Sequence, residues 1–398
     1  MSIATELQEL TQNTTTLDGI RTDIRTALSD KGVGASTHNF ADFANDISSI
    51  RVNNDIAPDL TNEVNNNEIW LVCDTTLPNN LINETVTCSS STKPDYNLYK
   101  YNPEDGSKTL VETYPNTQTL RINVSYNDYG RWCLVKITPH TSGKTIASLN
   151  DTSYYDGTTG ELVFYTRDCT VALYAKLPNA TSVICHSSTL STCKLLNMQS
   201  VTKLADGLRA CYSLKNLDMT GITTTATLTT LSSLFYTCYT LPSVPSVLSN
   251  LDTSKVTTFA NCFYGCYALK SVDISNWDFS KATSISSFAY ACYSMSELDF
   301  SGLSTTSVLT TAQQFLRYFG QYVPANETVK VWIPNTFDCT GITNASYKPF
   351  NYTSSTHTID VYTNVASATD AEALGWGTIN TTWFTMHYGA THNDFLNA

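Results

Sequence analysis

The sequence has little charge. Only 15% of its 398 residues are Asp, Glu, Lys or Arg, against roughly 25% in ordinary globular proteins. The net charge is −12 and Lys and Arg form no cluster, so we expect no nucleic-acid partner. Ser, Thr, Asn and 23 Tyr take the place of charged residues. A polar but uncharged surface of this kind is common among secreted adhesins and virion proteins.

The sequence also lacks a long apolar run. No stretch approaches the roughly 18 consecutive apolar residues of a membrane span, so we expect no membrane insertion. The first residues have neither the basic start nor the apolar core of a signal peptide. We therefore expect the chain to be made in a reducing cytoplasm.

Catalytic and metal-binding patterns are missing as well. The six His residues are scattered and show neither a triad order nor a metal-ligand spacing. Glu297 beside Asp299 is a possible carboxylate pair for glycan cleavage. However, Asp218, Asp273 and Asp299 share one offset after the repeated Cys described below, which favours a structural turn. We expect no enzyme activity, no catalytic residue, no cofactor and no metal site.

What the sequence does have is a block repeated four times around a Cys-Tyr pair. The spacings between successive pairs are 27, 28 and 26 residues, and apolar residues return at fixed offsets from each Cys. A period in the twenties predicts a solenoid, in which each unit buries its apolar edge only against its neighbours. The four pairs are Cys211-Tyr212, Cys238-Tyr239, Cys266-Tyr267 and Cys292-Tyr293.

The repeated Cys and Tyr suggest different roles. The chain has 12 Cys, too few for its length to indicate a disulfide scaffold, and the repeated ones should form a buried ladder of thiols. A further Tyr lies three residues before the Tyr of the last three pairs, and on a helical turn the two positions share a face. The aligned rings either bind sugar faces and donate hydroxyls or only pack on one another. The candidate ligand-binding residues are Tyr212, Tyr239, Tyr267, Tyr293, Tyr236, Tyr264 and Tyr290.

Residues 1–52 are predicted to be helical. Residues 1–30 carry a heptad pattern with Thr14 and Arg21 as its polar positions, and a second short helix follows at 39–50. A coiled coil this short needs partner chains to bury its stripe of apolar side chains. The alternative is a helix that packs on the globular part of its own chain. We favour self-association as a homotrimer. The expected contact residues are Leu7, Leu10, Leu17, Ile24 and Leu28.

The remainder divides into three segments. Residues 58–178 alternate short apolar runs with turn clusters, which favours a β-sandwich. Residues 179–330 are the solenoid, and residues 331–398 form a small α/β cap followed by a tail from residue 390. The expected fold class is mainly β and multidomain, α+β overall, with coiled-coil-like N-terminal helices. The strands expected in the sandwich are 68–73, 98–101, 119–124, 131–137, 161–165 and 170–176.

The repeats resemble the BspA-type leucine-rich repeat family of bacterial surface proteins and of phage and prophage proteins. The family pattern is a Leu-x-x-Leu-Asp-Leu-Ser strand, an Asn-Phe-Asp-Thr-Ser-x-Val-Thr turn and a Met-Phe-x-x-Cys helical turn. Residues 269–283 with 288–292, and residues 251–257 with 263–266, match it. The resemblance implies adhesion or recognition. The sequence departs from the family pattern at the position after the Cys. This position is usually variable and polar in the family, but it is Tyr in all four units here.

The flanks resemble phage structural proteins. Residues 1–50 are similar to the N-terminal segment of phage fibre and head-decoration proteins, and residues 359–389 to the end of phage-encoded repeat proteins. The resemblance implies a virion protein, a tail or head fibre, that attaches to other virion proteins by its N-terminal helices. Its repeats would bind a host-surface glycan or protein. A bacterial BspA-type adhesin is the alternative, and a glycan depolymerase a minor one.

Overall fold

The structure is a computed structural model. The described residues are 57–77, 80–89, 92–150, 169–222, 228–351 and 358–398. The chain divides into a small unit, residues 1–58 and 101–108, and a large unit with all the rest. In the small unit, residues 101–108 form a turn in which the Gly106 N–H donates to the Asn102 carbonyl at 2.8 Å. The helices and contact residues expected within 1–52 lie outside the described residues.

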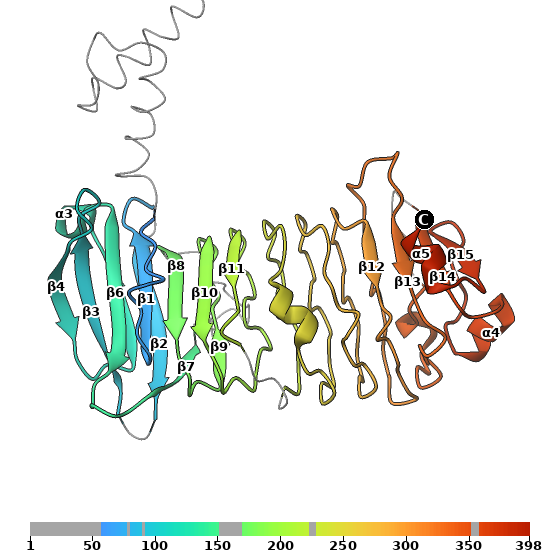
Figure 1. The fold of residues 1–398 in the computed structure, drawn as a ribbon, viewed down its shortest axis with the longest axis horizontal. Coiled ribbons are helices and arrows are strands. Elements are labelled where there is room, and N and C mark those ends of the chain that lie inside the picture. The colour runs from blue at the N-terminus through green and yellow to red at the C-terminus, as the bar shows by residue number, and fades with distance from the viewer. Residues whose placement is uncertain (1–56, 78–79, 90–91, 151–168, 223–227, 352–357) are drawn as a thin grey trace, which may run out of the picture. The chain divides into compact units, whose positions relative to one another are not determined.

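The first part of the large unit is built on two sheets (Figure 1). The seven-stranded sheet has the order β11-β10-β8-β1-β6-β3-β4, and a four-stranded sheet has the order β5-β2-β7-β9. The central strand β1 (Glu68–Asp74) is antiparallel to both β6 (Trp132–Pro139) and β8 (Thr170–Lys176). The other strands are β2 (Leu81–Cys88), β3 (Pro94–Tyr101), β4 (Lys108–Tyr114), β5 (Thr119–Asn123), β7 (Ile146–Asn150), β9 (Ser182–Ile184), β10 (Thr192–Asn197) and β11 (Asn216–Asp218).

Alternating side chains of these strands fill a common core. Ile69, Leu71 and Cys73 on β1 are fully buried and belong to the same cluster as Ile82 and Val86 on β2. Their spacing of two along the strand places them on one face of the sheet. Five of the expected strands are confirmed within a few residues, and the sixth, 161–165, lies outside the described residues.

The expected fold class is wrong. The seven-stranded sheet does not end at residue 178, because β8 pairs in parallel with β10 and β10 pairs in parallel with β11 inside the repeats. The described residues therefore form three sheets, one of which spans both segments, rather than a β-sandwich beside a separate leucine-rich-repeat solenoid. Their α-helices are short: α3 (Tyr126–Tyr129), α4 (Ala368–Ala373) and α5 (His392–Leu396). Short 3-10 helices lie at η1 (Ser246–Asn250) and η2 (Ala345–Tyr347).

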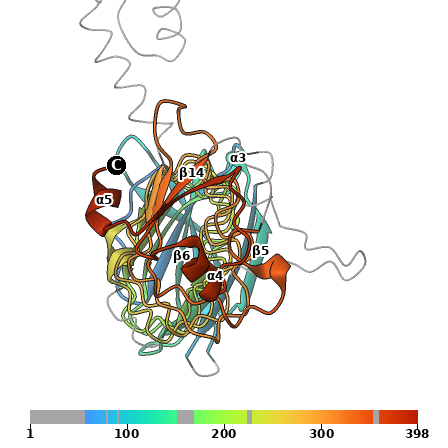
Figure 2. The same ribbon diagram turned by 90° about the vertical axis from the view of Figure 1, so that its right-hand side faces the viewer.

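We call residues 201–222 and 228–322 the repeat stack, because their successive turns lie side by side and superpose when the large unit is turned to face its C-terminal end (Figures 1 and 2). Parallel bridges connect the units one to the next, from Thr230 to Thr258, from Thr258 to Ser284 and from Ser284 to Thr311. Fully buried Leu, Phe and Cys side chains fill the inside. Each unit therefore forms its backbone hydrogen bonds and its apolar contacts with the neighbouring units.

The segment before each repeated Cys is not the expected helical turn. Five residues and one residue before each Cys, the backbone has a positive φ, as at Ser233 (56°) and Thr237 (60°). An α-helix would direct its N–H groups along its own axis, but here alternate N–H groups point to the next unit. Ser233, Phe235 and Thr237 donate to the carbonyls of Ala260, Cys262 and Tyr264 at 2.9, 2.9 and 2.6 Å.

A parallel sheet closes the C-terminal part, in the order β12-β13-β14-β15. Its strands are β12 (Glu297–Asp299), β13 (Lys330–Trp332), β14 (Ile359–Thr363) and β15 (Phe384–Tyr388). The tail expected from residue 390 contains α5 instead. This helix begins with a capping box between Thr391 and Asp394, and its Phe395 carbonyl accepts from Lys330 Nζ at 2.6 Å. The buried Phe395 side chain explains why the segment packs on the sheet.

Candidate functional site

The repeated Cys residues form the inner edge of the repeat stack. All four are fully buried. The thiol of Cys238 donates to the Leu208 carbonyl at 3.0 Å, and the thiol of Cys266 donates to the Phe235 carbonyl at 3.2 Å. Burial raises the pKa of the Cys238 thiol because the thiolate would lose its hydration. These thiols are therefore neutral donors that connect units.

The Tyr that follows each Cys belongs to a first column of stacked rings. Ring centroids are 4.9 Å apart between Tyr212 and Tyr239, 4.5 Å between Tyr239 and Tyr267, and 4.7 Å between Tyr267 and Tyr293. The planes of these pairs differ by 20° or less. Tyr322, 67% exposed, extends the column at 4.5 Å with a tilt of 47°.

The other three predicted Tyr residues form a second column. The centroid distance is 4.6 Å between Tyr236 and Tyr264 and 4.5 Å between Tyr264 and Tyr290. An arginine lies at each end. The guanidinium carbon of Arg209 is 4.9 Å from the Tyr236 ring and that of Arg317 is 5.9 Å from the Tyr290 ring. The structure thus brings all seven predicted residues together in two columns.

The arginines were missed from the sequence, although a signal existed. Arg209 lies two residues before Cys211, at the offset that Tyr236 occupies before Cys238. Arg317 has the same place in the unit that follows the fourth Cys-Tyr pair and has no repeated Cys. The Ala291 N–H donates to the Arg317 carbonyl just as the Gly265 N–H donates to that of Tyr290. Guanidinium over an aromatic ring is a favourable cation–π arrangement. Applying the Tyr offset to Cys211 would have found Arg209, whereas the unit of Arg317 has no Cys from which to count.

The columns limit how the rings can bind a ligand. Tyr239, Tyr267 and Tyr264 each have a neighbouring ring against both faces. A sugar face therefore has no place to stack on them without separating two units. The rings are half-buried, so it is their edges that are exposed to solvent. The site can form hydrogen bonds through a regular row of phenol groups.

Burial also raises the pKa of two of these phenols. Burial first, and the neighbouring Tyr267 and Tyr212 second, raise the pKa of Tyr239 to about 12. Burial likewise raises the pKa of Tyr264 to about 12, with Tyr290 and Tyr236 as secondary causes. Both effects disfavour the charged phenolate. At neutral pH Tyr239 and Tyr264 are therefore neutral hydrogen-bond donors and acceptors.

The repeated acids have the structural role that their common offset predicted. One carboxylate oxygen of Asp218 accepts from the Thr220 N–H at 2.9 Å, and that of Asp273 accepts from the Ser275 N–H at 3.1 Å. These are Asx turns, which fix the chain at the end of a strand-like segment. Asp299 makes the same turn with the Ser301 N–H at 2.8 Å.

The possible carboxylate pair has other partners. Glu297 lies 3.5 Å from Lys330 Nζ, and Asp299 Oδ2 lies 2.8 Å from His392 Nε2. Both partners belong to the C-terminal part, so the two carboxylates connect the repeat stack to it. In the described part of the chain, no group of three His, Cys, Asp or Glu could hold a metal ion, and no helix is long and apolar enough to cross a membrane.

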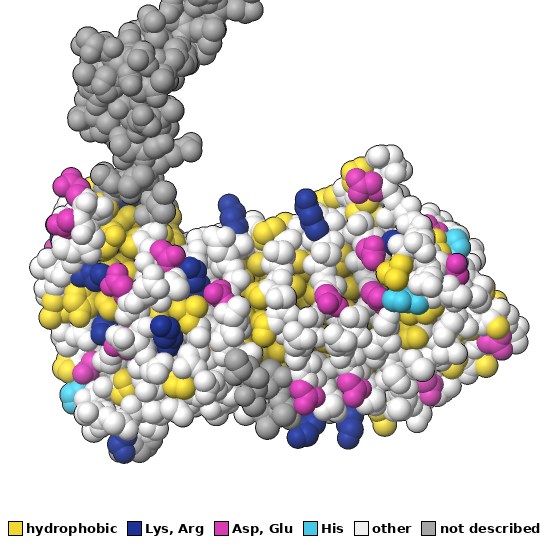
Figure 3. Space-filling model, in the orientation of Figure 1, with side chains coloured by type: hydrophobic (Ala, Val, Ile, Leu, Met, Phe, Trp, Pro, Cys, Tyr) yellow, Lys and Arg dark blue, Asp and Glu magenta, His cyan; other side chains and the backbone are white. Residues whose placement is uncertain are grey.

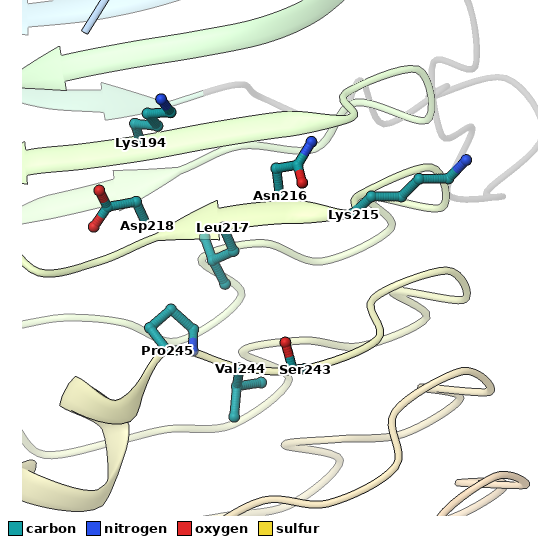
Figure 4. A pocket seen from close by; sticks show the side chains of 8 residues that line it. All are labelled: Lys194, Lys215, Asn216, Leu217, Asp218, Ser243, Val244 and Pro245. Atoms are coloured by element: carbon teal, nitrogen blue, oxygen red, sulfur yellow. The ribbon is translucent and has the colours of Figure 1, made fainter.

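A small groove opens where the seven-stranded sheet stops. It has a volume of about 300 Å³ and lies between β11 and residues 243–245. Figure 4 shows Asn216 and Asp218 on the strand across from Ser243 and Pro245. Proline lacks an N–H for a further ladder bond. Two of the groove's charged groups already have partners, since Lys194 contacts Asp59 at 3.1 Å and Asp218 makes its turn.

Comparison with known proteins adds one similarity. Residues 194–330 match the model of a family described as Mycoplasma protein of unknown function, DUF285. The match contains the repeat stack and leaves the first and last parts of the chain unmatched. No curated protein and no solved structure shows a significant match. The comparison therefore assigns no activity.

Proposed function

We propose that this protein is a structural subunit of a phage particle, a fibre or decoration protein, that presents the repeat stack for recognition of a host surface. The observation that carries the proposal is the pair of tyrosine columns. They place seven hydroxyl-bearing rings at regular intervals on a backbone held by hydrogen bonds between units. Stacked rings lose little conformational freedom on binding, which favours their use in recognition.

The surface chemistry supports the same proposal. On the face shown in Figure 3, uncharged polar and backbone atoms predominate over the repeat stack, and Lys and Arg are sparse. A surface poor in charge binds neutral, hydroxyl-rich ligands better than nucleic acid. The partner class that fits is a host-surface glycan or protein that hydrogen-bonds to the phenol edges.

Replacing Tyr239, Tyr264 and Tyr267 together by Phe tests this role. Phe keeps the stacked rings but removes three hydroxyls. We expect binding to host cells or to an array of bacterial surface glycans to fall about tenfold or more, since each lost hydrogen bond weakens binding, with little change in melting temperature. A matched control is Tyr99→Phe, on β3 outside the columns. Unchanged binding by the triple variant would contradict recognition through the columns.

Electron microscopy tests the assignment to a particle. Gold-labelled antibodies against the purified chain should label phage particles induced from the source bacterium. The resemblance to BspA-type repeats also fits a bacterial surface adhesin, and labelling of cells without labelling of particles would favour that alternative.

Attachment to other virion proteins and assembly into a homotrimer through residues 1–52 stay predictions from the sequence. Sedimentation of the full chain beside a chain that starts at residue 53 tests them. Equal oligomeric states would contradict self-association through this segment.

A further inference from the structure

The parallel sheet at the C-terminal part ends at β15. Among the described residues β15 is hydrogen-bonded to β14 on one side and is the last strand of the sheet on the other. The Ile359 N–H donates to the Trp383 carbonyl at 2.8 Å. Because bonding residues alternate along a parallel ladder, the backbone groups of Thr385 and His387 face β14, and those of Met386 and Tyr388 face away from it.

A groove of about 660 Å³ lies along this edge. The side chains of Phe384, Met386 and Tyr388 line it from β15, and Ile379 lines it from the preceding loop. Phe384 is buried and the others are half-buried against the core. The groove therefore presents apolar side chains directly beside strand-edge hydrogen-bonding groups. This is the combination that a further β-strand uses.

The charge of the groove indicates what kind of strand fits. Helix α4 contributes Ala368 and the exposed Glu372, which is the one charged residue in the lining. Two copies of the chain paired edge to edge would bring both Glu372 carboxylates into one groove, where they repel. The chain's net charge of −12 also opposes such a dimer. A strand that carries a Lys or Arg would instead complement Glu372.

We propose that this groove binds an extended peptide segment of another protein, which adds to β15 as a further strand. Its alternate apolar side chains fill the groove, and a basic residue pairs with Glu372. A strand rises about 3.3 Å per residue, so about three residues of the peptide lie alongside Met386–Tyr388 of β15. This site is separate from the tyrosine columns, and its binding does not depend on their role.

A synthetic peptide with the full-length chain tests the proposal. The probe is a fluorescent eight-residue peptide in which Val alternates with Thr and Lys, followed by fluorescence anisotropy. Two N-methylated versions carry the methyl groups either on every Val or on every Thr and Lys. Since only alternate N–H groups of an added strand face its neighbour, one version should lose affinity at least about tenfold and the other should bind much as the parent does. Equal affinities of the two versions would overturn strand addition.

Variants of the protein test the groove and its charge. Ala368→Trp fills the groove and should abolish binding, whereas Ala373→Trp, also exposed on α4 but outside the lining, should not. Glu372→Gln should weaken binding of the Lys-containing peptide by up to about fivefold and leave binding of a peptide with Thr in place of Lys unchanged. Equal effects of the two Trp variants would contradict the site. A dimer that forms with rising concentration in sedimentation and that Ala368→Trp dissociates would also contradict the proposal. The groove would then be occupied by a second copy of the chain.

Discussion

The ring of Tyr264 lies on the ring of Tyr290, with 4.5 Å between the centroids and 4° between the planes. The two residues are one repeat unit apart in the sequence. Their separation is close to the ~4.8 Å between neighbouring strands, because the backbones of the two units are held by hydrogen bonds such as Gly265 N–H to Tyr290 O at 2.8 Å. The ring column therefore repeats the spacing of the backbone.

Truncation of one ring should lower stability. Tyr264→Ala removes two stacked pairs, each worth about 0.5–1.5 kcal/mol beyond the buried area. We expect the free energy of unfolding to fall by about 2–4 kcal/mol, whereas Tyr264→Phe should change it by less than about 1 kcal/mol. Denaturant titration of both variants measures this. A loss below about 0.5 kcal/mol for the Ala variant would show that stacking is unimportant.

Alkaline pH should destabilise the protein through the columns. The pKa of Tyr239 and of Tyr264 is raised to about 12 in the folded chain, against about 10 in an unfolded one. The folded state then holds the protons more tightly, so this stabilisation is complete below pH ~10 and is lost as pH rises to ~12.

Melting temperature measured from pH 8 to 12, beside tyrosinate absorbance, tests this prediction. Replacing Tyr239 and Tyr264 by Phe should make the alkaline loss shallower, because two of the titrating groups are gone. An equally steep loss in this double variant would assign the effect to other groups.

The sequence predicted the columns better than the backbone that carries them. The period of the Cys-Tyr pairs placed seven Tyr residues correctly because a regular stack repeats side-chain positions unit by unit. It did not predict the positive φ at Ser233 and Thr237, since residues other than Gly adopt that conformation only when neighbours impose it. The pairing of β8 with β10 was also missed, because strand pairing depends on the neighbour a strand meets in the fold.

The buried thiols should contribute through their hydrogen bonds as well as their volume. Cys266→Ala removes a thiol that donates a hydrogen bond to the Phe235 carbonyl of the preceding unit. The control is Cys262→Ala, which removes an equally buried thiol that is not one of the four repeated Cys. We expect Cys266→Ala to lower the free energy of unfolding by about 0.5 kcal/mol more than Cys262→Ala, because a thiol is a weak hydrogen-bond donor. Chemical denaturation of the two variants in parallel measures the difference. Equal losses would mean that the thiols act only by filling space.

Gly302 should be the least replaceable residue of the turn that follows β12. An added Cβ would lie 2.1 Å from the Trp277 carbonyl oxygen, and the Asx turn of Asp299 with Ser301 prevents the chain from moving away. Gly302→Ala should lower the free energy of unfolding by about 3 kcal/mol or more. Gly389→Ala is the control, because its φ is +69° but nothing lies within 4 Å of the added atom, so only about 1 kcal/mol of backbone strain is expected. Thermal denaturation of both variants measures the two losses of stability. Equal losses would show that glycine is not required at position 302 by the close approach of the chain to Trp277.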